Sequence, residues 1–176
     1  DAAVCGACPL RPIAAKIARQ QGNIVDACYV NKGWLGKLWD SIPNLPRVHP
    51  EIIGQFLEST GLEFREGAWG DPAAVPMWVR RELNRGRGTS YTHQWATDWV
   101  DPGVKDFSMA SVQSIEEKNA ANELGYRTYR ITDTDDDDLQ PDEILCPEIT
   151  SNATCKACGL CAGNRVQAKN IAIRPI

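Results

Sequence analysis

The sequence predicts an α/β fold, with helices and strands alternating along a single domain of 176 residues. Apolar residues recur at helical spacing in three segments between residues 50 and 124. Short segments rich in β-branched and aromatic residues follow these segments. This alternation is typical of a parallel sheet, whose strands need crossover connections. We expect a βα core over residues 49–133, flanked by a cysteine loop at 1–31 and a cysteine loop with a terminal strand at 146–176.

Three helices are expected in the core. The first begins at Pro50, which suits a first helical turn, and ends before Gly61, which suits a helix stop. The spacing of apolar residues places the second helix at 73–84. The third is expected at 115–124, with Gly125 as its stop.

Strands are expected at 62–65, 89–95, 107–112 and 126–132, and a last strand at 170–173. In a parallel sheet, the loops after the carboxyl ends of the strands form the functional site. We therefore expect Asp71, the residues after Gln94, Gln113 and Asp133 on one rim of the sheet.

Composition favours an ordinary globular chain, with 43% hydrophobic and 24% charged residues. The net charge of −4 gives no support to a protein that coats nucleic acid. A phosphate contact by the arginines at 80, 81, 85 and 87 stays open, beside a role at the end of a helix. No run of about 18 apolar residues is present, so we expect no membrane contact and a cytoplasmic location.

The strongest motif is a run of three thiols at two-residue gaps, Cys155, Cys158 and Cys161, preceded by Cys146 next to Pro147. The chain has seven cysteines, an odd number, in clusters. Such spacing indicates metal or cluster ligation more than a disulfide framework. Four thiolates of this kind match the ligand set of a 4Fe-4S cluster. Zinc is the alternative, although it usually takes its cysteines from two separate knuckles.

A second group contains Cys5, Cys8 and Cys28. Three thiolates would leave one iron of a cluster open to an outside ligand, as an enzyme would require. Alternatively, the two cysteine groups share their ligands, or Cys28 is a buried cysteine that packs as a small hydrophobic residue. The sequence therefore predicts one or two 4Fe-4S clusters.

Three further residues are candidates for cofactor binding: Gly70, Asp71 and His93. Asp71 before Pro72 is well explained as a turn residue or the N-cap of a helix, which is the alternative to cofactor binding. For His93, an ordinary structural role on its strand is the alternative to a base. The acidic run at 133–138 is interpreted as a solvated loop.

Taken together, Cys5-x-x-Cys8-Pro9, Cys28-Tyr29, the Gly70-Asp71-Pro72 loop, Tyr91-Thr92-His93 and the C-terminal cysteine motif carry a resemblance. The chain resembles a family of uncharacterised, cysteine-rich proteins encoded by bacteriophages. That likeness covers nearly the whole chain. It implies the cytoplasm of the host cell as the location, and it implies no catalytic residues.

A more distant likeness is to the radical S-adenosylmethionine enzymes, whose partial βα barrel holds a three-cysteine cluster. This resemblance implies an incomplete barrel here, with a cluster at Cys5, Cys8 and Cys28. It further implies that the loop around Gly70 and Asp71 binds S-adenosylmethionine. The spacing differs, because Cys28 lies twenty positions beyond Cys8, whereas that family has its three cysteines in one short loop.

Three functional hypotheses follow. The first is an iron-sulfur enzyme of the radical S-adenosylmethionine type, in which the C-terminal cysteines hold an auxiliary cluster. The second is a non-catalytic iron-sulfur protein whose cluster joins the two chain ends for folding, redox sensing or partner binding. The third is a zinc-stapled binding module. The sequence identifies neither a partner nor a substrate, and whether the protein is an enzyme stays open.

Overall fold

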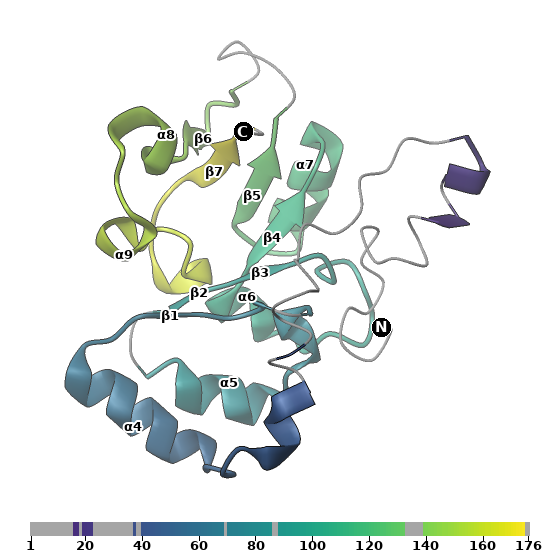
Figure 1. The fold of residues 1–176 in the computed structure, drawn as a ribbon. Coiled ribbons are helices and arrows are strands. Elements are labelled where there is room, and N and C mark those ends of the chain that lie inside the picture. The colour runs from purple at the N-terminus through teal and green to yellow at the C-terminus, as the bar shows by residue number, and fades with distance from the viewer. Residues whose placement is uncertain are drawn as a thin grey trace.

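Figure 1 shows the fold in a computed structural model. The structure describes residues 16–17, 19–22, 37, 40–68, 70–85, 88–132 and 139–174. This part of the chain is a mixed α/β fold built on a five-stranded, all-parallel sheet. The α/β prediction is therefore confirmed. Within the described ranges, no helix has the length and apolar character that crossing a bilayer requires.

The main sheet has the strand order β3-β4-β5-β7-β6. The chain thus adds neighbouring strands up to β5, and then β7 enters between β5 and β6 (Figure 1). In register, Ala110 lies opposite Thr128, and Tyr129 lies opposite Ile171. The strand bounds are β3 (Tyr91–Thr92), β4 (Met109–Val112), β5 (Thr128–Ile131), β6 (Glu143–Leu145) and β7 (Asn170–Ile173).

A second, two-stranded parallel sheet is formed by β1 (Phe64–Arg65) and β2 (Gly88–Thr89). Only Ser90 separates β2 from β3. Its carbonyl oxygen accepts a hydrogen bond from the Met109 N–H at 2.9 Å, and its own N–H donates to the Cys161 carbonyl oxygen at 3.2 Å. The extended segment 88–92 therefore passes from one sheet to the other, and the cysteine loop is bonded to it at the junction.

Three helices contribute to a core on one face of the main sheet: α5 (Met77–Leu83), α6 (Val104–Phe107) and α7 (Ile115–Glu123). Met77, Val104 and Ala121 from these helices pack with Ala110 and Val112 of β4. The remaining long helix, α4 (Pro50–Thr60), lies along α5 (Figure 1). Short 3-10 turns at η1 (Ile42–Asn44) and η2 (Pro72–Ala74) precede α4 and α5.

The C-terminal cysteine segment covers the opposite face. It carries α8 (Pro147–Ser151), α9 (Cys155–Cys158) and the 3-10 turn η4 (Gly163–Arg165). Buried Met109 and Ile171 form a small core there with Cys146, and the half-buried Tyr91, Tyr129, Ile144, Leu160, Cys161 and Ile173 pack around it. Because successive side chains of a strand point to opposite faces, this core is distinct from the one beneath α7.

The helix prediction from Pro50 to Thr60 is confirmed to the residue. Pro50 is at its first position, and Gly61 ends it in the left-handed conformation with φ 63°. The strand predicted at 170–173 is also confirmed. The helix predicted at 115–124 is confirmed with its end one residue earlier.

Several predicted boundaries are wrong. The helix predicted to start at residue 73 begins only at Met77, because Pro76 lacks an N–H to continue the 3-10 turn into it. The strand predicted at 107–112 begins at Met109, since Val104–Phe107 forms a helical turn. The strands predicted at 62–65, 89–95 and 126–132 are shorter in the structure, and Glu143–Leu145 is a strand that was not predicted.

Candidate cysteine site

Four cysteines line one cavity of about 80 Å³ on the face of the sheet opposite α7. They are Cys146, Cys155, Cys158 and Cys161, and none forms a disulfide. Cys146 is buried, Cys158 and Cys161 are half-buried, and Cys155 is exposed. The structure thus brings the four C-terminal thiols of the sequence motif to one place, although Cys146 lies nine residues before Cys155.

The turn α9 positions Cys155 and Cys158. The Thr154 hydroxyl accepts a hydrogen bond from the Ala157 N–H at 3.2 Å and caps the start of the turn. Gly159 ends the turn with φ 62°, and its N–H donates to the Cys155 carbonyl oxygen at 2.9 Å. Residues three apart lie on the same side of a helical turn, so Cys155 and Cys158 face the cavity together.

Cys146 is held by the sheet. It follows β6 directly, and its N–H donates to the Ala172 carbonyl oxygen of β7 at 2.8 Å. Pro147 starts α8, and the Cys146 carbonyl oxygen accepts from the Ile149 N–H at 2.9 Å. The backbone on both sides of this thiol is therefore fixed by hydrogen bonds.

Burial makes two of the thiols, Cys146 and Cys161, weaker acids in the protein without a bound cation. Burial and, to a smaller extent, the nearby cysteines together raise the pKa of Cys161 to about 11, against a lowering effect of Tyr91. Burial also raises the pKa of Cys146. A bound metal reverses this preference, because it binds thiolates and displaces their protons.

Two tyrosines form the wall between the thiols and the sheet. The rings of Tyr91 and Tyr129 lie 4.6 Å apart and are tilted by 55°. Burial raises the pKa of both phenols, so each hydroxyl stays protonated and can donate a hydrogen bond. The Tyr91 phenol and the Cys161 thiol line the same cavity, and their interaction raises the pKa of the phenol and lowers that of the thiol.

Arg127, just before β5, ties the cysteine segment to the sheet. Its Nη1 donates to the carbonyl oxygens of Leu160 at 2.7 Å and Gly163 at 3.0 Å. Its Nε donates to Ala168 at 2.9 Å, and its Nη2 donates to Lys169 at 2.6 Å. One guanidinium therefore satisfies backbone carbonyls on both sides of η4.

The predicted cofactor residues form a separate group. The Oδ1 atom of Asp71 accepts from the Ala73 N–H at 2.9 Å and from the Thr92 hydroxyl at 2.7 Å, and its Oδ2 accepts from the His93 N–H at 2.8 Å. Asp71 is thus the N-cap of η2, as the alternative interpretation of the sequence has it. Gly70 precedes it with φ 86°.

The side chain of Thr92 points to the face of β3 opposite that of Tyr91, so the structure does not bring Asp71 to the cysteine cavity. Half-buried His93 follows β3, and burial lowers the pKa of its imidazole although Asp71 and Glu117 raise it. The Gln113 N–H, after β4, donates to Glu117 at 2.8 Å. S-adenosylmethionine binding by this group stays a prediction.

The cysteines predicted as the second group, Cys5, Cys8 and Cys28, lie outside the described residues, as does Asp133. In the part of the chain that the structure describes, no three His, Cys, Asp or Glu side chains converge closely enough to hold a single metal ion. The four thiols surround a cavity instead of one point.

Comparison with protein-family models, with curated proteins and with solved structures finds no match. Any function proposed for it therefore rests on its own residues and their geometry.

Sequence reasoning missed Tyr91, Tyr129 and Arg127 as parts of the site. Both tyrosines lie in predicted strands, and an aromatic side chain beside a cysteine turn is visible only once the register of β3, β4, β5 and β7 is known. Arg127 comes directly before a strand, and no local pattern distinguishes it from a surface arginine.

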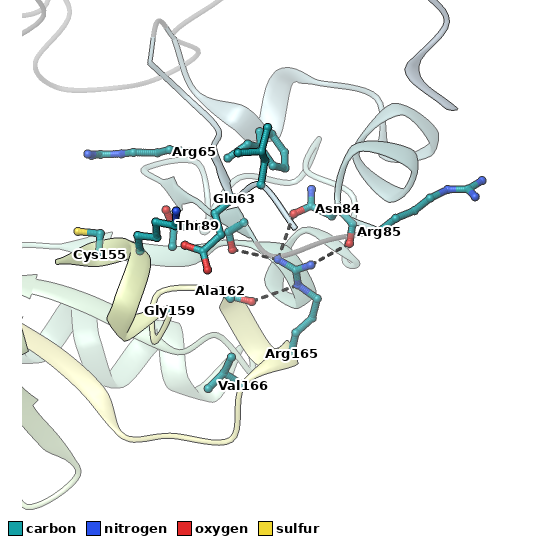
Figure 2. Close-up of a pocket in the computed structure, with 14 residues that line it drawn as sticks. Glu63, Arg65, Asn84, Arg85, Thr89, Cys155, Gly159, Ala162, Arg165 and Val166 are labelled. Atoms are coloured by element: carbon teal, nitrogen blue, oxygen red, sulfur yellow. Dashed lines mark hydrogen bonds between the residues drawn. The ribbon is translucent and has the colours of Figure 1, made fainter. Parts of the chain in front are cut away.

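A larger pocket of about 650 Å³ adjoins the cysteine cavity (Figure 2). Four residues line both hollows: Arg65, Thr89, Cys155 and Gly159. On the far wall, the Arg165 guanidinium donates to the carbonyl oxygens of Asn84 and Gly88, each at 3.0 Å. The exposed thiol of Cys155 thus lies at the boundary between the cysteine cavity and an open pocket.

Proposed function

We propose that this protein binds a 4Fe-4S cluster through Cys146, Cys155, Cys158 and Cys161. The observation that carries the proposal is that these four thiols line one cavity. Its volume of about 80 Å³ is several times the roughly 10–15 Å³ that one water requires on this measure. A hollow between four thiols suits a group of several atoms, and four thiolates are the usual ligand set of such a cluster.

The surroundings support the same proposal. Cys146 follows a strand end, and Cys155 and Cys158 lie in a turn that is capped at both ends, so the backbone of these three cysteines needs little ordering on binding. The Tyr91 hydroxyl is placed at Cys161, and hydrogen bonds to cluster sulfurs are one of the means by which proteins set reduction potentials. Zinc bound by the same four thiols is the alternative that the experiment below must separate.

For the fold, we propose an incomplete βα barrel. Strand neighbours follow chain order from β1 through the joined β2 and β3 to β5, as in a barrel. The core formed with α5, α6 and α7 lies on one face, and the cysteine cavity lies on the other, which would be the inside. A second cluster at Cys5, Cys8 and Cys28, and S-adenosylmethionine beside it, remain part of this proposal.

The deciding experiment measures iron, zinc and acid-labile sulfide in the protein purified without oxygen, together with its absorption spectrum. We expect a brown protein with about four irons and four sulfides for each cluster. A colourless protein that contains zinc and no sulfide would overturn the proposal in favour of the zinc module.

Replacing single thiols tests the ligand assignment. In a chain that already carries Cys5→Ala, Cys8→Ala and Cys28→Ala, we expect about four irons, and Cys158→Ala should remove most of the bound iron because a thiolate ligand is lost. Lys156→Ala is the matched control, since Lys156 is an exposed residue in the same turn α9 without a thiol. Iron and sulfide that persist at the control level in Cys158→Ala would contradict the assignment.

The Tyr91 hydroxyl provides a prediction for the loaded protein. Tyr91→Phe removes the hydroxyl that would donate a hydrogen bond to the Cys161 thiolate, and a sulfur without that hydrogen bond stabilises the reduced, more negative cluster less. We expect the midpoint potential to fall by up to about 59 mV, the equivalent of a tenfold change in a one-electron couple. A redox titration followed by absorbance measures it.

Tyr129→Phe is the control for this variant, because Tyr129 lines the same cavity and its ring contacts that of Tyr91. Its phenol is close enough to feel the charges of Cys146 and Cys161, but no hydrogen bond to a thiol contributes to its pKa. Equal potentials in the wild type and in Tyr91→Phe would show that the hydroxyl does not act on the cluster.

A further inference from the structure

The pocket beside the cysteine cavity has the size of a small-molecule site. Its volume of about 650 Å³ lies within the roughly 300–1,000 Å³ typical of such sites. Part of its lining is apolar. Leu62 lies just before β1, Phe64 lies in β1, and Val166 follows η4. Phe64 is half-buried and Leu62 is 45% exposed, so apolar surface is available to a ligand.

The charges around this pocket are unequal. Its lining contains four cationic side chains, Arg65, Arg85, Lys156 and Arg165, and one carboxylate, Glu63. An excess of one charge around a concave site concentrates ligands of the opposite charge.

Two of the four cations form ion pairs or hydrogen bonds with other residues of the protein. Arg85 forms ion pairs with Glu82 at 2.5 Å and Glu51 at 3.8 Å. The donors of Arg165 are directed at oxygens of Asn84, Gly88 and Ala162, so this residue builds the wall (Figure 2).

The other two cations, Arg65 and Lys156, form no ion pair with any residue in the described ranges. The Arg65 guanidinium lies over the Tyr91 ring, 5.4 Å from its centre. Lys156 follows Cys155 in α9. Figure 2 shows Arg65 and Cys155 together at one end of the pocket, with Arg85 at the other end. The positive charge that remains available is therefore located next to the exposed cysteine.

We propose that this pocket binds a small organic anion, with its charged group at Arg65 and Lys156 and its apolar part against Leu62, Phe64 and Val166. The charged end of such a ligand would lie beside Cys155. Binding requires only the side chains of the pocket, so the inference does not depend on the metal that the four thiols hold.

The test compares two probes with the same aromatic rings. Anilinonaphthalene sulfonate carries an anionic group, and phenylnaphthylamine lacks it. We expect the full chain, purified without oxygen, to bind the sulfonate at one site and at least tenfold more tightly than the neutral probe. Isothermal titration calorimetry measures both affinities without interference from a coloured protein.

Arg65→Gln and Lys156→Gln should each weaken sulfonate binding on the order of tenfold, the usual value of one charge-assisted hydrogen bond. Their affinity for the neutral probe should stay within about twofold of the wild type, which also shows that the pocket remains folded. Arg81→Gln is the control, since Arg81 is exposed on α5 and does not line the pocket.

Equal affinity for the two probes in the wild-type protein would overturn the inference. So would sulfonate binding that is as strong in Arg65→Gln and Lys156→Gln as in Arg81→Gln, because the two cations would then serve only to balance charge at the cysteine site. A protein that holds zinc instead of a cluster, but discriminates between the probes, would contradict the proposed function and support the pocket.

Discussion

The Gly163→Ala variant is expected to lose about 2–5 kcal/mol of unfolding free energy and most of its capacity to bind iron. Gly163 has φ 62°, where a side chain costs about 1–2 kcal/mol. A Cβ atom there would also lie 2.7 Å from the Asp106 carbonyl oxygen, the Phe107 carbonyl carbon and the Ser108 nitrogen. These are backbone atoms and cannot rotate away, so the cysteine segment must move off the end of α6.

Gly61→Ala is the matched control for this change. Gly61 has nearly the same conformation, with φ 63°, but a Cβ atom there would have no neighbour within 4 Å. We expect it to lose only about 1–2 kcal/mol and to keep its iron. Urea unfolding followed by circular dichroism, with iron analysis of each variant, measures both effects. Similar losses for the two variants would show that η4 is not in close contact with α6.

Arg80→Met should destabilise the fold by about 3–5 kcal/mol, because it leaves a buried carboxylate without its partner. Arg80 is fully buried and pairs with Glu66, whose side chain is 6% exposed. Its Nη2 also donates to the hydroxyl groups of Ser108 at 2.6 Å and Ser90 at 3.2 Å. Arg80 thus connects α5 to the residues that precede β3 and β4.

The double variant Arg80→Met with Glu66→Leu separates the charge from the packing. Removing both ions takes away the unpaired charge, so we expect the double variant to be more stable than Arg80→Met alone. Denaturant unfolding of the wild type, the two single variants and the double variant gives the coupling energy. An Arg80→Met variant within about 1 kcal/mol of the wild type would contradict a structural role for this pair.

The helices that were predicted well begin and end at residues whose effect is local, within a few positions of the chain. Pro50 and Gly61 mark both ends of α4, and each acts through its own backbone conformation. For α7, the Ser114 hydroxyl accepts from the Glu117 N–H at 3.1 Å, a cap readable from the sequence alone. The spacing of Cys155, Cys158 and Cys161 likewise indicated that these residues lie together, and they line one cavity.

The rest depends on partners that are distant in the chain. The two-residue strands β1, β2 and β3 have too little length for a periodic signal, and their bounds are set by pairing across the sheets. Glu143 of β6 is buried, and both of its carboxylate oxygens accept from Arg130, at 2.8 and 2.7 Å. In the sequence, an acidic residue indicates an exposed loop more than a buried strand. For this reason β6, the strand that positions Cys146, was not predicted.

The backbone hydrogen bond between Ser90 and Cys161 connects the junction of the two sheets with the cysteine cavity. Ser90 is the residue where the two sheets join, and Cys161 belongs to the cysteine cavity. A ligand that binds only the folded cysteine segment stabilises, by mass action, both this segment and the parts of the sheet on which its folding depends. Binding of the proposed cluster would therefore also stabilise the junction between the two sheets, and its removal would weaken that junction.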